Sequence, residues 1–236
     1  LLSEFGHDDH RRRRLRRRAL SARCAAGESG RAGAVEVLAG LRAGEGERVI
    51  LDIVEEREQK RIITAPFIDD LDTLPRPAYD YFQHPRYWTR VPPCPEDPIY
   101  TMNTSRGCPF NCRFCSVKGV WGRTYRMFSA ERIVDDIERL ITDYRIKGVY
   151  FREDHFTFNY ERVMRFCELV LKKNIRMTWF CESRVNDLDR DILVLMKRAG
   201  CAWLYLGCES GSERMLSYLQ KGISVDQIRH TIGLCN

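Results

Sequence analysis

Residues 104–116 are TSRGCPFNCRFCS, a stretch in which three cysteines stand at the spacing C-x3-C-x2-C. The three are Cys108, Cys112 and Cys115, so one short loop presents three thiols together. Three thiolates on one loop can bind three irons of a cubane 4Fe–4S cluster and leave the fourth iron without a protein ligand. An open iron is useful where a substrate or cosubstrate binds to it. The spacing therefore predicts an iron–sulfur site that takes part in chemistry.

Two other kinds of site stay open on spacing alone. A structural zinc site prefers paired C-x2-C or Cys/His arrangements, and no second pair or nearby histidine completes a tetrahedron here. An electron-transfer iron–sulfur protein requires a fourth cysteine. The next cysteine, Cys167, falls on the apolar face of an expected helix, so we expect a core thiol there. An electron carrier remains an alternative of a different functional class.

After this loop the sequence alternates between strand and helix patterns. Strands are expected at 99–103, 148–151, 177–181 and 202–206. Helices are expected from a cap at Ser129, around 163–171, and over 187–199, 212–221 and 224–235. Consecutive strand–helix units predict a parallel sheet with right-handed crossovers. Such sheets carry their active sites at the carboxyl ends of the strands.

Composition and charge restrict the functional classes. The chain has 236 residues, 44% of them hydrophobic and 31% charged, which excludes a mainly disordered protein. No apolar run approaches the roughly 20 residues of a membrane span. The net charge is +6, but residues 11–18 hold seven arginines, and 6 − 7 leaves −1 for the rest. We expect a solvated Arg-rich tail, with a nucleic-acid-binding module as the disfavoured alternative, and reduced thiols in the cytoplasm.

The cysteine stretch, followed by Trp121-Gly122-Arg123 and Tyr125-Arg126, resembles the radical S-adenosylmethionine superfamily. More narrowly, it is similar to the class whose members often carry a cobalamin-binding domain before the radical domain. The resemblance extends over 66–222, through IDDLDTLPRPA (68–78), EDHFTFN (153–159), ESRV (182–185), LMKRAGC (195–201), GCESGSERML (207–216) and Lys221-Gly222. It implies an α/β fold, a partial parallel (β/α) barrel truncated after about four strands, behind an irregular N-terminal segment.

The resemblance also implies an activity. S-adenosylmethionine would chelate the open iron of a cluster held by the three cysteines. One electron from the reduced cluster would cleave S-adenosylmethionine to methionine and a 5′-deoxyadenosyl radical. Cobalamin-dependent methyl transfer is the favoured subtype, and a cobalamin-linked oxidative ring cyclase of the tetrapyrrole kind is the alternative. The implied partners are a small-molecule substrate and an electron donor such as flavodoxin or ferredoxin, without nucleic acid.

Polar residues at the expected strand ends are the candidates for holding the cosubstrate. A cationic sulfonium and an ammonium require carboxylates, and a methionine carboxylate requires a cation. We expect the following contacts: the adenine with Phe114, the ammonium with Glu153 or Asp154, the carboxylate with Arg184, and the ribose with Glu209 and Ser210. One departure from the superfamily weakens the ammonium assignment. The Gly-Gly-Glu that is common in the superfamily at the end of the second strand is absent. Arg152-Glu153-Asp154 takes its place in this chain.

The expected organisation has four segments and treats the chain as a piece of a longer protein. Eight of the nine prolines fall in one of these segments, which indicates extended, helix-poor chain. The preceding segment contains a short expected helix (34–41) and a short expected strand (49–54). In order, the segments are a low-complexity Arg-rich tail (1–30), a candidate remnant of a cobalamin-binding domain (31–65), a Pro-rich linker (66–98) and a radical SAM core incomplete at its C-terminus (99–236).

The cysteine spacing generates a first testable prediction. Anaerobic reconstitution should give about four irons and four sulfides per chain, and replacing Cys108, Cys112 or Cys115 by Ala should abolish the cluster because each thiolate holds one iron. The matched controls Cys167→Ala and Cys201→Ala should retain it. Iron and sulfide analysis with absorption spectroscopy measures this, and full loading of Cys112→Ala would contradict the assignment.

Overall fold

The computed structural model describes residues 45–51, 55, 65–81 and 98–236, and the chain divides into two compact units, Leu1–Ile68 and Asp69–Asn236. In the first unit, η1 (Gly46–Arg48) is a 3-10 turn, and Ile50 and Leu51 are helical. The strand expected at 49–54 is therefore wrong at these positions. A helix satisfies its backbone polar groups within one segment, whereas a strand requires a neighbour. The helix expected at 34–41 lies outside the described residues.

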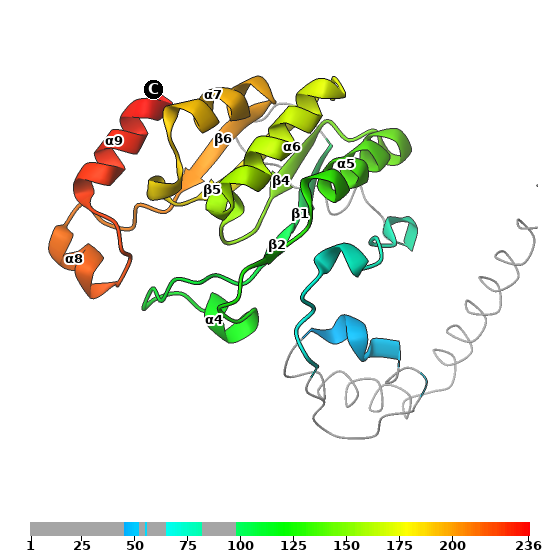
Figure 1. The fold of residues 1–236 in the computed structure, drawn as a ribbon, viewed down its shortest axis with the longest axis horizontal. Coiled ribbons are helices and arrows are strands. Elements are labelled where there is room, and N and C mark those ends of the chain that lie inside the picture. The colour runs from blue at the N-terminus through cyan, green and yellow to red at the C-terminus, as the bar shows by residue number, and fades with distance from the viewer. Residues whose placement is uncertain (1–44, 52–54, 56–64, 82–97) are drawn as a thin grey trace, which may run out of the picture. The chain divides into compact units, whose positions relative to one another are not determined.

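The second unit is built on a four-stranded parallel sheet with the order β1-β4-β5-β6 (Figure 1). The expected parallel sheet is confirmed, with each strand beside the next one in the chain. Register pairs Met102 with Phe151, Phe151 with Cys181, and Ser183 with Leu206, so the carboxyl ends of the strands meet at one edge. The strands are β1 (Ile99–Met102), β4 (Gly148–Phe151), β5 (Thr178–Ser183) and β6 (Cys201–Leu206).

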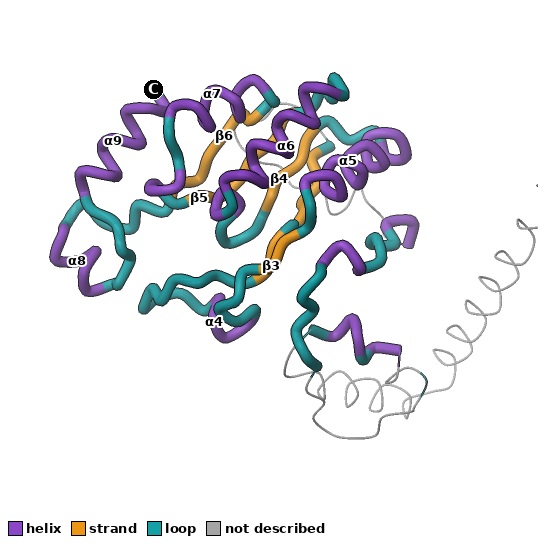
Figure 2. The backbone as a smooth tube through the Cα atoms, in the orientation of Figure 1, coloured by secondary structure: helices purple, strands orange, loops and turns teal. Residues whose placement is uncertain are grey.

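Three helices connect these strands and lie on one side of the sheet: α5 (Ala130–Tyr144), α6 (Tyr160–Lys172) and α7 (Arg190–Arg198) (Figure 2). The predicted cap of α5 is confirmed, since the Ser129 side chain accepts a hydrogen bond from the Arg132 amide. Helix α7 begins later than expected because 185–187 form a 3-10 turn and Asp189 is the cap. Gly200 follows α7 with φ +96°, as expected for the residue after a helix.

The hydrophobic core fills the space between the sheet and these helices. Its centre is a group of fully buried rings, Phe151, Phe156, Phe166 and Trp179, whose centroids are 4.4–6.0 Å apart. Each such side chain contributes roughly 1.5–3 kcal/mol by leaving water. The Trp179 indole N–H also donates to the Ala199 carbonyl at 2.9 Å, which satisfies its one polar group. The strands that lead to the predicted site are thus supported by a well-packed core.

The cysteine loop is an excursion closed by a short antiparallel ladder. Its base is the pair β2 (Ser105–Arg106) and β3 (Arg126–Met127), in which Ser105 lies opposite Met127. Between them the chain makes the cysteine turns and α4 (Val117–Val120). Two further helices follow β6 at the same end of the unit, α8 (Glu213–Tyr218) and α9 (Val225–Cys235). The loop is therefore held at its base by the ladder.

The described part of the proline-rich segment, 69–81, belongs to the second unit and packs along α5. Asp72 accepts a hydrogen bond from the Ser129 amide at 3.0 Å through its carboxylate. The Arg132 guanidinium donates to the carbonyls of Asp72 and Leu74 at 2.8 and 3.1 Å. These hydrogen bonds join the segment to the first turn of α5, and the segment covers part of that helix.

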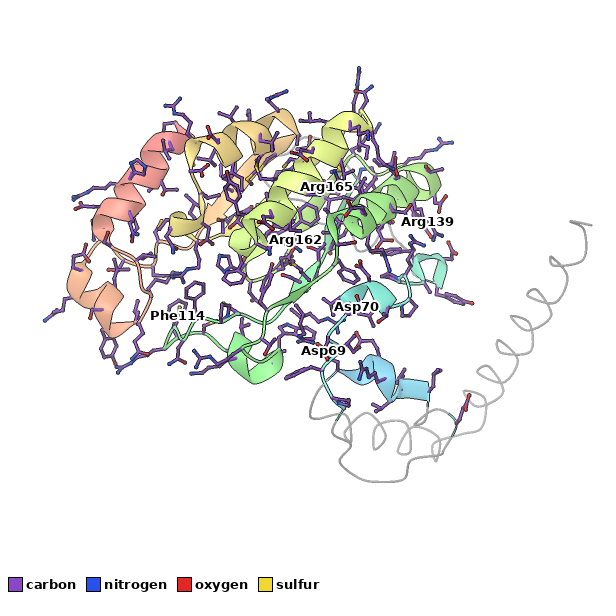
Figure 3. The ribbon with its side chains drawn as sticks, in the orientation of Figure 1. Asp69, Asp70, Phe114, Arg139, Arg162 and Arg165 are labelled. Atoms are coloured by element: carbon purple, nitrogen blue, oxygen red, sulfur yellow. The ribbon has the colours of Figure 1, made fainter. Side chains whose placement is uncertain are left out.

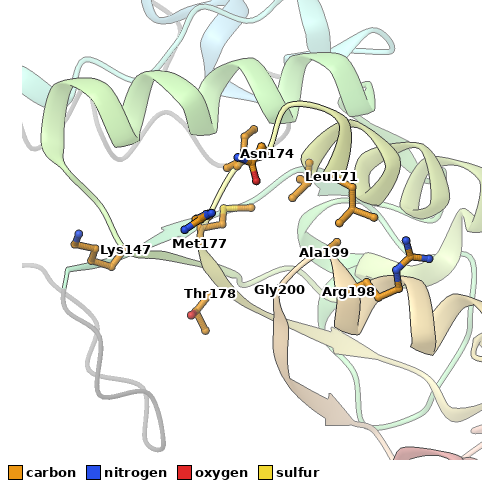
Figure 4. Close-up of a pocket in the computed structure, with 11 residues that line it drawn as sticks. Lys147, Leu171, Asn174, Met177, Thr178, Arg198, Ala199 and Gly200 are labelled. Atoms are coloured by element: carbon orange, nitrogen blue, oxygen red, sulfur yellow. The ribbon is translucent and has the colours of Figure 1, made fainter.

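An open cavity of about 740 Å³ lies at the amino ends of the strands, lined in part by Lys147, Met177, Thr178 and Gly200 (Figure 4). These residues precede or begin β4, β5 and β6, whereas the predicted site residues follow those strands. The cavity is thus at the end of the sheet opposite the predicted chemistry. Among the described residues, no helix combines the length and the apolar character that a membrane span requires.

Candidate functional site

The three predicted ligands lie in the excursion between β2 and β3. Gly107 begins the turn with φ +85°, and a Cβ atom there would come within 2.1 Å of the Thr124 carbonyl oxygen, so only glycine fits. Cys112 is buried, while Cys108 and Cys115 are partly exposed. The Cys115 amide donates to the Cys112 carbonyl at 3.2 Å, which folds the C-x2-C segment into a turn. The three cysteines therefore lie within one short, turned loop, with Cys112 on its buried side.

The donor set of the loop fits an iron–sulfur cluster, which takes thiolate ligands. Burial raises the pKa of the Cys108 thiol, the charges of Cys115 and Cys112 raise it further, and the Arg184 guanidinium opposes them. Within the described part of the chain, no three His, Cys, Asp or Glu side chains converge on a single metal ion. A cubane cluster requires no such convergence because each thiolate binds a different iron. Three neighbouring thiols with one cation fit that group.

Arg184 links the end of β5 to the cysteine loop. It is 5% exposed, its Nη1 lies 3.8 Å from the Cys112 sulfur, and its guanidinium carbon lies 3.8 Å from the centroid of the Phe110 ring. Nη2 donates to the Lys221 carbonyl, and Nε donates to Asn186 at 3.3 Å. Three of the five N–H donors of the guanidinium are therefore engaged by the protein. Its predicted contact with a methionine carboxylate stays a prediction.

Glu153 is enclosed beneath the cysteine loop. Its Oε1 accepts a hydrogen bond from the Thr104 hydroxyl at 2.5 Å, and its Oε2 accepts one from the Ser105 hydroxyl. Arg162, which reaches down from α6 (Figure 3), lies 4.0 Å from this carboxylate and donates to the Thr104 carbonyl at 3.0 Å. With 4% exposure and both oxygens engaged, Glu153 supports the base of the loop. Of the two carboxylates predicted for the ammonium, Asp154 is the exposed one.

Asp154 shares its surroundings with a second carboxylate. Burial raises the pKa of Asp154, and the negative charge of Glu182 raises it further. The Tyr150 hydroxyl donates to Glu182 at 2.9 Å. A cation bound near these two carboxylates would offset the repulsion that raises the pKa of Asp154. The sequence placed Glu182 among the candidates at a strand end but assigned it no contact.

Glu209 lies beside the cysteine loop as part of an ion pair. Its Oε1 accepts a hydrogen bond from the Lys221 ammonium at 2.7 Å, and that ammonium lies 5.6 Å from the centroid of the Phe114 ring. Lys221 is 6% exposed and Phe114 is 52% exposed. The next residue, Ser210, accepts a hydrogen bond from the Ser212 amide at 3.2 Å. The structure thus brings Phe114, Glu209 and the cysteine loop together through Lys221, which is part of the resemblance but had no predicted contact.

The sequence model of the radical SAM superfamily matches residues 102–236, which are more than half of the chain. This chain belongs to the radical SAM superfamily. Membership implies a 4Fe–4S cluster and S-adenosylmethionine as the cofactors of this domain. The resemblance of the cysteine stretch is therefore confirmed.

Curated relatives and solved structures extend this finding. A protein described as an uncharacterized methyltransferase of Pyrococcus horikoshii is 32% identical over 202 residues, 78% of this chain and 43% of the relative. The anaerobic magnesium-protoporphyrin IX monomethyl ester cyclase of Rubrivivax gelatinosus is 27% identical over 81% of this chain and 38% of that protein. The chain thus spans less than half the length of these two relatives.

The fold is also that of a solved radical enzyme. The cobalamin-dependent S-adenosylmethionine radical enzyme OxsB superposes with a TM-score of 0.59 at 20% identity, covering 81% of this chain and 30% of that one. At this identity the likeness concerns the fold alone. The partial parallel barrel expected from the sequence is therefore confirmed.

The end of α8 and the residue that follows it contact the cysteine loop. The Arg113 amide donates to the Leu219 carbonyl at 2.9 Å, and the Arg113 guanidinium lies 5.1 Å from the centroid of the Tyr218 ring.

A buried histidine also contacts the loop: His155 is 1% exposed, and its ring centroid lies 5.6 Å from that of Phe110. Its Nε2 is paired with Asp187, and its Nδ1 has no hydrogen-bond partner among the described residues. Neither contact was predictable from spacing.

The position of Arg184 in the radical SAM site leads to a second prediction. A cation beside a cluster sulfur stabilises the more negative, reduced state. We expect Arg184→Gln to make the cluster potential more negative and to lower the reduced fraction about tenfold at a fixed donor potential, the equivalent of a charge-assisted contact of about 1.5 kcal/mol. An EPR-monitored redox titration measures this. Arg198→Gln, at the opposite end of the sheet, is the control, and an unchanged potential with full iron content would contradict the expectation.

Proposed function

We propose that this chain is the S-adenosylmethionine-cleaving domain of a radical enzyme. The observation that carries the proposal is the cysteine loop at the carboxyl edge of the parallel sheet, with Arg184 beside Cys112 and carboxylates at neighbouring strand ends. Positive and negative groups that meet at one edge suit a cosubstrate that carries an ammonium, a sulfonium and a carboxylate.

In this proposal different residues of the chain bind different groups of S-adenosylmethionine. Cys108, Cys112 and Cys115 hold the cluster. The remaining contacts are the ammonium and sulfonium with Asp154 and Glu182, the carboxylate with Arg184, the ribose with Glu209 and Ser210, and the adenine with Phe114. Glu153 acts as a support of the loop instead, because its two carboxylate oxygens already accept hydrogen bonds.

The chemistry that a reduced cluster supplies is one-electron cleavage of S-adenosylmethionine to methionine and a 5′-deoxyadenosyl radical. We propose that the whole enzyme uses it for cobalamin-dependent methyl transfer to a small-molecule substrate. Two likenesses support this subtype: the relative described as a methyltransferase and the fold of the cobalamin-dependent OxsB. The described cysteines are all free thiols, which suits a reducing cytoplasm.

A second candidate function is oxidative ring closure on a tetrapyrrole. It is favoured by the 27% identity to the cyclase of Rubrivivax gelatinosus, which extends over 81% of this chain. Both candidates share the radical-generating step and differ in the substrate and in the reaction that follows. Product analysis with candidate substrates separates them, because only one of the two reactions adds a methyl carbon.

The test of the proposed function is cosubstrate cleavage by the reconstituted protein. With dithionite as the reductant, we expect 5′-deoxyadenosine to form, and we expect added S-adenosylmethionine to change the EPR spectrum of the reduced cluster. Chromatography with mass detection measures the product. An intact, reducible cluster that neither responds to S-adenosylmethionine nor produces 5′-deoxyadenosine would instead indicate an electron-transfer protein.

The ribose assignment leads to a separate prediction. Losing a charge-assisted hydrogen bond costs about 1.5–3 kcal/mol, so Glu209→Gln should weaken S-adenosylmethionine binding roughly 10- to 150-fold without changing the iron content. Titration of the cosubstrate into the reconstituted protein measures this, with Glu168→Gln on the exposed side of α6 as the control. Unchanged affinity would make Glu209 only the partner of Lys221. Loss of the cluster as well would show that the ion pair maintains the fold.

A further inference from the structure

Three turns that connect a helix to the next strand each place a cation at the cavity of about 740 Å³ at the amino ends of the strands. Lys147 directly precedes β4, Arg176 precedes β5, and Arg198 is the last residue of α7. All three side chains are exposed and line the cavity. Figure 4 shows Lys147 and Arg198 on opposite sides of Met177 and Thr178. The positive charges are therefore spread along the cavity.

No acidic side chain balances these charges. The other polar side chains that line the cavity, those of Asn174 and Thr178, are neutral. Within the described part of the chain, none of the three cations forms an ion pair with an aspartate or a glutamate. Exposed cations elsewhere on the helical side of the sheet do so, as when Arg165 pairs with Glu131 at 2.8 Å. The cavity therefore presents uncompensated positive charge to a ligand.

Stabilisation of helix ends explains only one of the three cations. Cations are favoured in the last turn of a helix because they offset the partial negative charge of its free carbonyls. Arg198 occupies such a position at the end of α7. Lys147 and Arg176 lie beyond the ends of α5 and α6, in the connections to the strands. The dipole effect falls off beyond the terminal turn, so it does not account for these two side chains.

Backbone contacts hold the three connections against one another. The Thr178 amide donates to the Lys147 carbonyl at 3.0 Å, and the Trp179 amide donates to the Gly200 carbonyl at 3.1 Å. Gly200 has a φ of +96°, and a Cβ atom there would overlap the Met177 carbonyl oxygen, so glycine permits the close approach of these two turns. The backbone that carries the cations is therefore fixed by the sheet, which lowers the ordering cost of binding a ligand.

The rest of the lining is mostly apolar. Small-molecule sites typically combine an apolar lining with a small number of charged or polar groups, in cavities of about 300–1,000 Å³. This cavity matches that description in size and composition. The apolar residues that line it are Val170, Leu171, Ile175, Met177 and Ala199. A ligand that fits the whole cavity therefore has an apolar group as well as negative charge.

We propose that this cavity binds an organic diphosphate, with its phosphate groups along Lys147, Arg176 and Arg198 and its apolar group against the apolar part of the lining. Guanidinium and ammonium groups bind phosphate oxygens through charge-assisted hydrogen bonds. A diphosphate spreads several negative charges over two linked phosphates, so it can contact separated cations at once, whereas a single carboxylate cannot.

The proposed site is separate from the cosubstrate site. Strand β5 has six residues, and a strand rises about 3.3 Å per residue, so roughly 20 Å separate the two ends of the sheet. The cysteine loop and the predicted cosubstrate contacts lie at the other end. The diphosphate therefore binds as a second ligand and does not compete with S-adenosylmethionine.

The experiment is calorimetric titration of geranyl diphosphate and of inorganic pyrophosphate into the whole chain. We expect Lys147→Gln, Arg176→Gln and Arg198→Gln each to weaken the binding of both probes about fivefold, as for the loss of one exposed ion pair. The triple variant should weaken it about 100-fold if the contributions add. Pyrophosphate should bind roughly tenfold less tightly than geranyl diphosphate because it buries no apolar group. Leu171→Ser should weaken only the binding of geranyl diphosphate.

The matched control is Lys197→Gln, which makes the same change as Lys147→Gln on an exposed lysine that does not line the cavity. Its affinity for both probes should stay within about twofold of that of the unmodified protein. Equal weakening by Lys147→Gln and Lys197→Gln, or unchanged binding in the triple variant, would overturn the site in favour of general charge attraction, for example to the Arg-rich tail.

Three further outcomes would also overturn the proposal. Absence of binding of both probes would exclude a diphosphate site. Equal affinities for pyrophosphate and geranyl diphosphate would exclude an organic ligand. Displacement of geranyl diphosphate by S-adenosylmethionine would place both ligands in one site, at the other end of the sheet.

Discussion

A buried carboxylate is costly unless hydrogen bonds and an opposite charge surround it, and Glu153 meets this requirement. Thr104 and Ser105, at the start of the cysteine excursion, donate to its two oxygens, and Arg162 from α6 lies 4.0 Å away. The network joins the end of β4, the base of the loop and a helix of the core. The rings of Phe110 and Tyr125 also pack against Phe158. The buried charge therefore fixes the base of the loop together with the β2–β3 ladder and these ring contacts.

A second link fixes the far side of the loop. Arg184 contacts the Cys112 sulfur and the Phe110 ring, and it donates to the Lys221 carbonyl. Lys221 in turn pairs with Glu209 at 2.7 Å. The loop, the ends of β5 and β6 and the segment after α8 are thus connected by charged side chains, of which Arg184 and Lys221 are buried. Burial strengthens the contacts of these two cations and fixes their positions in the site.

Negative and positive side chains near the site come from different segments of the chain. Asp154 and Glu182 place negative charge near the strand ends, where a cationic cosubstrate would bind. The outer surface of the loop is cationic and carries no acidic residue between positions 98 and 130. Negative charge therefore comes from the strand ends, and the loop itself contributes only positive charge.

Sequence alone determined the features that depend on local spacing and periodicity. Three cysteines in one C-x3-C-x2-C stretch must lie on one loop, and alternating apolar segments, a Ser129 cap and Gly200 define parallel strand–helix units. The tertiary structure decided which polar side chains are free. Glu153 and Asp154 are adjacent in the turn after β4, but Thr104, Ser105 and Arg162 enclose the first and leave the second exposed. The contacts of Arg184 with Cys112 and of Lys221 with Glu209 join residues 72 and 12 positions apart. No local pattern encodes such pairs, because they depend on the register and packing of the whole sheet.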